Sequence, residues 1–301
     1  MAYRKLEQLS KNLKSNFFYN YDVSTSTWFQ AGGKTDVFCL LSDEKELDII
    51  LNHTENLPIF VIGAGSNLLV RDGGFRGLII KLGKSFNNLA LKDNFIHVGA
   101  SILDLNLSKF ALSNSLSNLE FFSGIPGSVG GAIKMNAGCY GSETKDVLEK
   151  VSVITKNGKK RNLYKKDLNL DYRNSNLTNK DIITSAVFKA DFGDKEKIKL
   201  IIKNIKYKRE IYQPLRTKTS GSTFKNPKGF YAAKLIEESG CKGLNVGDAQ
   251  VSDKHANFII NHNEATAKDI EDLGKIVQDK VYKKFDICLD WEIKIIGESS
   301  E

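Results

Sequence analysis

Long hydrophobic runs are missing from this sequence. The longest apolar stretches, near residues 59–62 and 78–80, have the length of a strand, whereas a membrane-spanning helix needs about 20 apolar residues. Residues 1–30 carry several basic side chains but no apolar core of the kind found in a secretory signal. We therefore expect a protein that works in the cytoplasm and does not bind a membrane.

Cysteine and histidine are also scarce, with four residues of each among 301. The four cysteines lie far apart, form no Cys-x-x-Cys pair and have no histidine at metal-ligand spacing: Cys39, Cys139, Cys241 and Cys288. We therefore expect reduced thiols and no metal site. A chain of this length buries roughly 75% of its unfolded surface and needs no disulfide or metal to hold a core.

The charge is unusual but evenly spread. The chain has 44 Lys and Arg against 36 Asp and Glu, a net charge of +8, and the excess is shared between residues 1–193 and 194–301 without a basic arm. Residues 195–211 combine many lysines with isoleucines spaced along one helix face: Ile198, Ile201, Ile202 and Ile205. This pattern favours a solvated amphipathic helix, and a nucleic-acid-binding stripe is the alternative.

Short strand and helix patterns alternate along the chain, which predicts a mixed fold. Strands are expected at residues 59–62, 77–82, 95–98, 151–154, 160–163, 181–189 and 286–294. Helices are expected at residues 43–51, 103–116, 195–211 and 231–239, and from a capping pattern at Thr266 and Asp269 to Phe285. A Lys-Asn-Gly-Lys turn at residues 156–159 predicts a hairpin.

Three common catalytic or nucleotide-binding motifs are absent. Gly63 and Gly65 follow a strand, but the third glycine of a dinucleotide fingerprint is replaced by Leu68. Gly83-Lys84-Ser85 lacks the leading glycine of a phosphate-binding P-loop, because position 78 is Leu. No Gly-x-Ser-x-Gly nucleophile elbow occurs.

Two glycine-rich segments remain, at residues 63–67 and 124–131. Consecutive main-chain amides without bulky side chains form anion-binding concavities, and two of them could hold a pyrophosphate. The alternative is that these glycines only form tight turns.

The ordered set of motifs resembles the UDP-N-acetylenolpyruvoylglucosamine reductases. The resemblance covers the chain from about Thr27 to Gly297, and its motifs lie at residues 61–67, 124–132, 135–138, 172–175, 213–214, 220–227, 255–258 and 292–294. It implies an α+β fold: an FAD-binding domain of two α/β subdomains, of the PCMH type, and a C-terminal α+β substrate-binding domain. We expect the two FAD-binding subdomains at residues 1–85 and 86–194, and the substrate-binding domain at residues 195–301.

The resemblance also implies an activity. It predicts NADPH-dependent, FAD-mediated reduction of UDP-N-acetylglucosamine enolpyruvate to UDP-N-acetylmuramate, an oxidoreductase step in peptidoglycan synthesis that serves cell-wall biogenesis, cell shape and cell division. It implies FAD as cofactor, NADPH as reductant and a small-molecule substrate, and we expect a monomer without nucleic-acid or membrane partners. An FAD-dependent oxidoreductase of the same fold acting on a sugar acid or alcohol is the alternative.

The family pattern assigns roles to particular residues. Arg173 and Glu292 would stabilise an enolic intermediate, Ser222 would deliver the proton, and Lys225 and Asn226 would contact the substrate. FAD would be bound by Gly63, Ala64, Gly65, Ser66, Asn67, Gly124, Ile125, Pro126, Gly127, Ser128, Gly130 and Gly131.

Two further expectations concern the surroundings of these residues. His255 should be structural. Some family members insert a loop that covers the substrate, but here the stretch from Arg173 to Ser222 is filled by the expected strand 181–189 and helix 195–211, so we expect the version without it.

Overall fold

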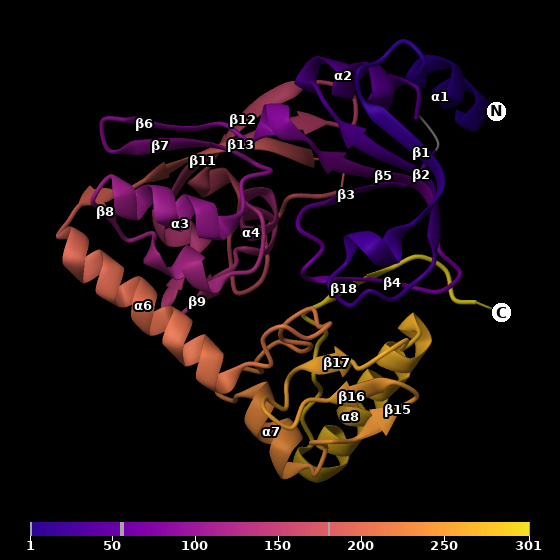
Figure 1. Ribbon diagram of the computed structural model, residues 1–301, viewed down its shortest axis with the longest axis vertical. Helices are drawn as coiled ribbons and strands as arrows, with labels where there is room; N and C mark the ends of the chain where they lie inside the picture. Colours follow the sequence, from indigo (N-terminus) through magenta and orange to yellow (C-terminus); the bar gives the residue numbers. More distant parts are fainter. Residues whose placement is uncertain (1, 55–56, 180, 301) are drawn as a thin grey trace. The chain divides into compact units, whose positions relative to one another are not determined.

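The chain folds into two compact units, each described by itself. Figure 1 shows the computed structural model, in which residues 2–54, 57–179 and 181–300 are described. Unit 1 comprises Met1–Tyr19, Val37–Ala64 and Gly77–Tyr207, and unit 2 comprises Asn20–Asp36, Gly65–Arg76 and Lys208–Glu301. The domain boundaries expected from the sequence, near residues 85 and 195, stay a prediction.

A five-stranded antiparallel sheet forms one layer of unit 1. Its order is β12 (Lys160–Tyr164), β11 (Leu148–Thr155), β13 (Asp181–Lys189), β7 (Phe95–Gly99) and β6 (Leu89–Lys92). Helices α3 (Asp104–Ser113) and α4 (Val129–Met135) pack against this sheet through Leu107, Val129 and Ile133, which are fully buried. The expected hairpin at residues 156–159 is confirmed, since it joins β11 to β12.

The second sheet has the order β1 (Asn16–Asp22), β2 (Lys34–Leu41), β5 (Phe75–Leu82) and β3 (Ile59–Ile62), with β3 parallel to β5. Helices α1 (Ala2–Ser10) and α2 (Glu44–Asn52) share a buried cluster with it that includes Leu6, Leu47 and Leu78. Asp43 caps α2 by accepting a hydrogen bond from the amide of Lys45 (3.0 Å). Unit 1 also contains short elements: β8 (Leu116–Ser117), β9 (Gly138–Cys139), β10 (Ser142–Glu143), α5 (Thr144–Val147) and β14 (Asp191–Phe192).

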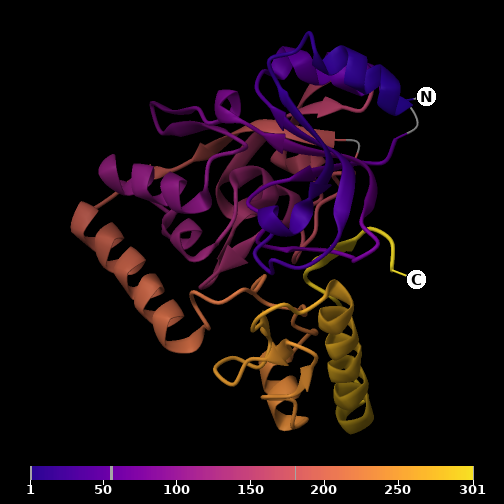
Figure 2. The same ribbon diagram turned by 45° about the vertical axis from the view of Figure 1, so that its right-hand side comes forward.

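Unit 2 contains a three-stranded antiparallel sheet and two helices. The sheet is β15 (Asn245–Val246), β16 (Ala249–Val251) and β17 (Ile259–Asn261), and it shares one core with α7 (Ala232–Glu238) and α8 (Ala267–Phe285), the long yellow helix of Figure 2. The expected capping box is confirmed, because Thr266 and Asp269 bond reciprocally at the start of α8. A second pairing joins β4 (Leu68–Val70) to β18 (Lys294–Ile296) in parallel.

Three elements differ from the sequence prediction. Helix α3 is shorter than residues 103–116, because its chain turns at Asn114 and Ser115 into β8. The strand expected at residues 286–294 is wrong for most of its length: the burial of Leu289 and Ile293 alternates as predicted, but only Lys294–Ile296 forms a ladder. Helix α6 (Lys195–Tyr212) buries Ile198 and Ile205, whereas Ile201 is 45% exposed, so its buried face is narrower than expected.

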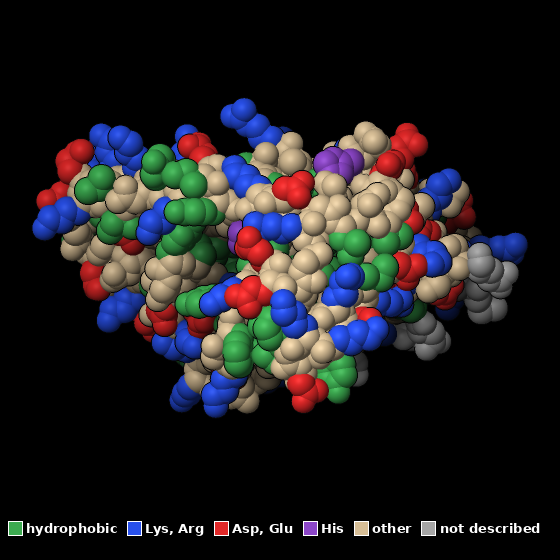
Figure 3. Space-filling view, turned by 90° about the horizontal axis from the view of Figure 1, so that it is seen from below, with side chains coloured by type: hydrophobic (Ala, Val, Ile, Leu, Met, Phe, Trp, Pro, Cys, Tyr) green, Lys and Arg blue, Asp and Glu red, His purple; other side chains and the backbone are tan. Residues whose placement is uncertain are grey.

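No described helix combines the length and the apolar character needed to cross a membrane. On the face drawn in Figure 3, Lys and Arg side chains lie among Asp and Glu side chains, consistent with the even charge distribution of the sequence.

Candidate active site

The start of the first glycine-rich segment lies against the second. A Cβ atom added to Gly63 would lie 2.3 Å from Ser128 Oγ, which is much shorter than a van der Waals contact. Both residues belong to unit 1. The structure therefore brings Gly63 and the 124–131 segment together, although 65 positions separate Gly63 from Ser128 in the sequence, and only a residue without a side chain fits there.

Two main-chain amides of the second segment are already bonded to residues elsewhere in unit 1. Val129 donates to the carbonyl of Ile102 and Gly130 to that of Ala100, both at 2.9 Å. The main-chain amides of Ser128 and Gly131, by contrast, have no hydrogen-bond partner among the described residues. These two N–H groups are the ones available to an anionic ligand such as a phosphate.

The rest of the first segment belongs to unit 2. Gly65 has φ +69°, a left-handed conformation that favours glycine, and its carbonyl accepts from the amide of Trp28 (3.0 Å). The side chain of Asn67 donates through Nδ2 to the carbonyl of Glu292 (3.1 Å). The family pattern assigns Asn67 to FAD, but this bond links its side chain to the backbone of Glu292, a proposed catalytic residue.

Arg173 stands at the tip of a tight turn in unit 1. Asp171 and Asn174 exchange two main-chain hydrogen bonds of 3.1 Å, and Arg173 between them has φ +52°, a strained value for a residue with a side chain. Its guanidinium donates through Nη2 to the carbonyl of Gly138 (2.8 Å) and lies 5.1 Å from the ring centre of Tyr172.

The segment after helix α4 holds this turn in place. Asn136 is fully buried and donates through Nδ2 to the carbonyl of Asp171 (2.9 Å), while Ser175 donates through Oγ to the carbonyl of Lys134 (2.7 Å). Both ends of the Arg173 turn are therefore fixed by residues 134–136. The sequence placed Asn136 in a family motif but gave it no role.

Ser222 lies on an extended segment of unit 2 between two other segments. Its backbone forms an isolated bridge with Phe258 on one side, and Phe224 forms one with Trp291 on the other. The hydroxyl of Ser222 has no hydrogen-bond partner in the part of the chain that the structure describes, and the side chain is only half-buried. It is thus a hydroxyl held on a fixed backbone and open to a ligand.

Glu292 is next to this segment. Its main-chain amide donates to the carbonyl of Thr223 (2.8 Å), the residue after Ser222, and its carbonyl accepts from Asn67. The structure therefore brings Ser222 and Glu292 onto neighbouring backbones of the same unit, as a shared site requires.

The two proposed substrate contacts have structural partners. The amide of Lys225 donates to the carbonyl of Asp290 (2.8 Å), which continues the pairing of the Ser222 segment. Asn226 accepts through Oδ1 from the amide of Ala232 (2.9 Å) at the start of α7. Their role toward the substrate stays a prediction.

His255 contacts the segment that pairs with Ser222. Its Nδ1 accepts from the amide of Asn257 (3.3 Å), and its ring packs edge-on against Phe258 at 4.6 Å between centres. Burial lowers the pKa of His255 below 6.5, and the positive charge of Lys242 adds to this effect. A neutral imidazole that accepts at Nδ1 fits the expected structural role.

Asp104 is an acid that the sequence gave no signal for. It is fully buried at the start of α3, neither carboxyl oxygen has a hydrogen-bond partner among the described residues, and burial raises its pKa well above the usual range. A Cβ atom on Gly127 would lie 2.7 Å from its Oδ2. A neutral carboxylic acid therefore lies directly against the second glycine-rich segment.

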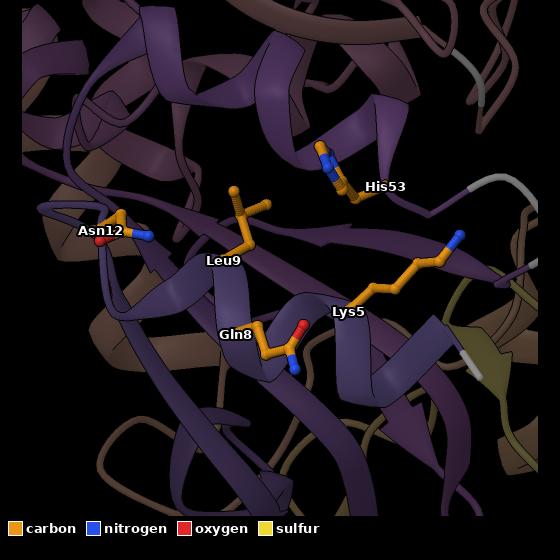
Figure 4. Close-up of a pocket in the computed structure, with 5 residues that line it drawn as sticks. All are labelled: Lys5, Gln8, Leu9, Asn12 and His53. Carbon is orange, nitrogen blue, oxygen red and sulfur yellow. The ribbon is translucent and has the colours of Figure 1, made fainter.

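Two surface pockets are lined by other residues of unit 1. One, of about 330 Å³, is lined by Lys5, Gln8, Leu9, Asn12 and His53 (Figure 4), and the other, of about 450 Å³, by Glu149, Tyr164, Lys165 and Lys166. Among the described residues, no cluster of three or more His, Cys, Asp or Glu side chains is arranged to hold a metal ion.

The matches to two family models define an FAD-dependent oxidoreductase. Residues 35–164 match the family model "FAD binding domain", and residues 213–296 match "UDP-N-acetylenolpyruvoylglucosamine reductase, C-terminal domain". The second match covers Ser222, Lys225, Asn226 and Glu292, and it sets aside the sugar-acid or alcohol oxidoreductase as the alternative.

Relatives of known name agree over nearly the full length. UDP-N-acetylenolpyruvoylglucosamine reductases of Rickettsia akari and Rickettsia conorii are both 42% identical to this chain, each alignment covering 95% of the chain and 97% of the relative. The crystal structure of the Thermus caldophilus reductase superposes with a TM-score of 0.82 at 35% identity, covering 94% of this chain and 98% of that one. The chain belongs to the UDP-N-acetylenolpyruvoylglucosamine reductase family.

The expectation of no inserted loop is confirmed. Between Arg173 and Ser222, the described residues 174–179 and 181–221 contain the regular elements β13, β14 and α6, and β13 and α6 are the strand and helix expected in place of such a loop.

Proposed function

We propose that this chain reduces the enolpyruvyl double bond of UDP-N-acetylglucosamine enolpyruvate with NADPH, yielding UDP-N-acetylmuramate for peptidoglycan synthesis. Membership of the reductase family supports this activity, and the observation that carries it in this chain is the hydrogen bond from the amide of Glu292 to the carbonyl of Thr223, the residue after Ser222. In the balanced reaction, C3 of the enolpyruvyl group gains a hydride, C2 gains a proton, and NADPH becomes NADP⁺.

FAD, when bound, supplies the two-electron chemistry between NADPH and the substrate. The residues present fit such a group: Ser128 and Gly131 offer main-chain N–H donors without partners in the described part of the chain, and Gly63 lies directly against the side chain of Ser128. We assign the pyrophosphate to the residues expected from the sequence, in the 63–67 and 124–131 segments.

Arg173 is proposed to stabilise negative charge. When C3 is reduced, charge develops at C2 and on the neighbouring carboxylate of the substrate. A guanidinium keeps its positive charge at all physiological pH values and can bind a carboxylate through two N–H groups. The strained turn that presents Arg173, held by Asn136 and Gly138, is the support for this role.

Ser222 is proposed to deliver the proton to C2, and Glu292 to polarise the enolic oxygen in its protonated form. A serine hydroxyl is a very weak acid, so it protonates only a strongly basic centre such as an enolate carbon. The half-buried Ser222 hydroxyl without a described partner supports this assignment. Lys225 and Asn226 are proposed to contact the substrate.

The proposed setting is a cytoplasmic monomer without a nucleic-acid or membrane partner. Size-exclusion chromatography tests the monomer, and a salt-dependent mobility shift with a polynucleotide would contradict the absence of a nucleic-acid partner.

The activity is tested on the purified protein with FAD. We expect bound FAD to be reduced by NADPH without air, and NADPH to be consumed in turnover only when the enolpyruvyl substrate is added. A protein that takes up no FAD, or whose reduced flavin is not reoxidised by this substrate, would contradict the proposal.

A further inference from the structure

We infer that Asn257 is a positioning residue for Ser222: its buried side-chain amide fixes the backbone that carries the proton-donating hydroxyl. The inference rests on the proposed role of Ser222. Asn257 is only 4% exposed and lies on the segment that bridges to Ser222 through Phe258.

Three hydrogen bonds join Asn257 to the two residues that follow Ser222. The amide of Phe224 donates to Asn257 Oδ1 (3.0 Å), and Asn257 Nδ2 donates to the carbonyl of Phe224 (2.8 Å). The amide of Thr223 donates to the carbonyl of Asn257 (2.8 Å). One side chain thus satisfies both main-chain polar groups of a buried residue, which would otherwise be costly to leave unpaired.

The Ser222 segment needs such support because it is not part of a continuous strand. Its pairing consists of isolated bridges at Ser222 and Phe224, and Gly221 before it has φ +78° and open space around the position of a Cβ. The main-chain bonds of Thr223 and Lys225 therefore leave both polar groups of Phe224 to be satisfied by a side chain. Asn257 does this at Phe224, two positions after Ser222.

The same segment sets the position of Glu292. The carbonyl of Thr223 accepts from the amide of Glu292, so a shift of residues 222–224 displaces the proton donor and the polarising acid together. Displacements of about 1 Å at a reacting group can slow a reaction by roughly 100-fold. Asn257 is therefore placed to affect the step that uses Ser222 and not the reduction of the enzyme by NADPH.

Asn261 offers a matched control in the same unit. It is equally buried, at 2% exposed, and its side chain also bridges two main-chain groups, donating to the carbonyl of Phe29 (2.9 Å) and accepting from the amide of Ala265 (2.9 Å). Its side chain makes no bond to residues 222–224. Replacing it removes a comparable amide from unit 2 without touching the Ser222 segment.

The experiment measures the two half-reactions of the FAD-loaded enzyme separately by stopped flow. For Asn257→Ala we expect flavin reduction by NADPH within about twofold of wild type, and reoxidation by the enolpyruvyl substrate slowed by roughly 10- to 100-fold. The solvent deuterium isotope effect on reoxidation should increase, because proton delivery becomes more limiting. Asn261→Ala should lose thermal stability and leave both half-reactions within about twofold.

Should Asn257→Ala fail to fold, Asn257→Asp keeps the size and the acceptor for Phe224 but removes the Nδ2 donor, and the same selective slowing is expected. Reoxidation at the wild-type rate in a folded Asn257 variant, or equal slowing of both half-reactions, would overturn the inference.

The double variant separates this inference from the proposed function. In a Ser222→Ala background, Asn257→Ala should slow reoxidation by no more than about twofold further, because its effect acts through the hydroxyl. A full additional slowing would overturn the positioning role. Normal reoxidation in Ser222→Ala alone would overturn the role of Ser222 and this inference with it, whereas a slow Ser222→Ala beside a normal Asn257→Ala would overturn only this inference.

Discussion

The side chain of Asn67 donates to the main-chain carbonyl of Glu292 at 3.1 Å, across 225 positions of sequence. This bond gives a glycine-rich segment assigned to the cofactor a second task, because it fixes the backbone next to a proposed catalytic acid. The main chain at residue 67 can serve FAD while its side chain serves Glu292.

Asn67→Ala tests this division of roles. Because the truncation removes the side-chain donor but keeps the backbone, we expect reoxidation by the enolpyruvyl substrate to slow by about 10-fold, while the FAD dissociation constant changes by less than about threefold. Titration of the apoprotein with FAD and stopped-flow reoxidation measure the two quantities. A large loss of FAD affinity with normal reoxidation would assign the side chain to the cofactor instead.

Gly63→Ala tests the contact between the two glycine-rich segments. The new Cβ would lie 2.3 Å from Ser128 Oγ, so the segments must move apart, and we expect a loss of about 1–3 kcal/mol in the free energy of unfolding together with weaker FAD binding. Gly131→Ala is the matched control for the loss of stability, since its Cβ would meet the same Oγ at an ordinary 3.6 Å.

A second replacement checks the cause. Ser128→Gly removes the hydroxyl that the Gly63→Ala methyl would strike, so the double variant should recover part of the lost FAD affinity. Equal free energies of unfolding in Gly63→Ala and Gly131→Ala would contradict a steric conflict at this contact.

His255 predicts a pH dependence of stability. Burial lowers its pKa in the folded protein below 6.5, so between the folded and unfolded pKa values the unfolded chain binds more protons. The free energy of unfolding should therefore fall as the pH falls through 6.5, and protonation also removes the Nδ1 acceptor from Asn257. Urea unfolding of wild type and His255→Gln across this range measures the effect; a difference independent of pH would contradict it.

Asp104 predicts the opposite trend. Burial raises its pKa, so the folded state holds its proton more tightly than the unfolded state, and stability is lost as the pH rises above 3.8 toward the raised value. Asp104→Asn keeps the shape without titrating. Its free energy of unfolding relative to wild type should increase with pH, by about 1.4 kcal/mol for each unit of pKa difference, as chemical denaturation at several pH values will show. If the difference in free energy of unfolding between Asp104→Asn and wild type did not change with pH, the prediction would be wrong.

Much of the fold could be predicted from local signals. The capping pattern at Thr266 set the start of α8, the helix expected at residues 43–51 is α2, and the hairpin turn at 156–159 set the pairing of β11 with β12. The pattern at residues 286–294 misled, because alternating burial arises wherever an extended chain lies on a core, whether or not a neighbouring strand completes the ladder. Leu289 and Ile293 are buried in this way without belonging to a strand.

The site was predictable only in part. Family motifs pointed to Arg173, Ser222 and Glu292. Asn136 and Asn257 also lie in such motifs, but no local pattern assigned them a role. Asn257 bonds to Phe224 across 33 positions and Asn136 to Asp171 across 35, and such partners follow from tertiary packing alone. Asp104 was missed for a similar reason, since an aspartate at a helix start is usually a solvated first-turn residue.

In the proposed reaction, Ser222 delivers the proton that completes reduction of the substrate. Its most direct measurement is a single-turnover experiment on Ser222→Ala loaded with FAD, reduced by NADPH without air and then mixed with the enolpyruvyl substrate. We expect flavin reduction within about twofold of wild type and reoxidation slowed by at least about 100-fold, since general acid catalysis contributes that much or more. Reoxidation and product formation at close to the wild-type rate would contradict it.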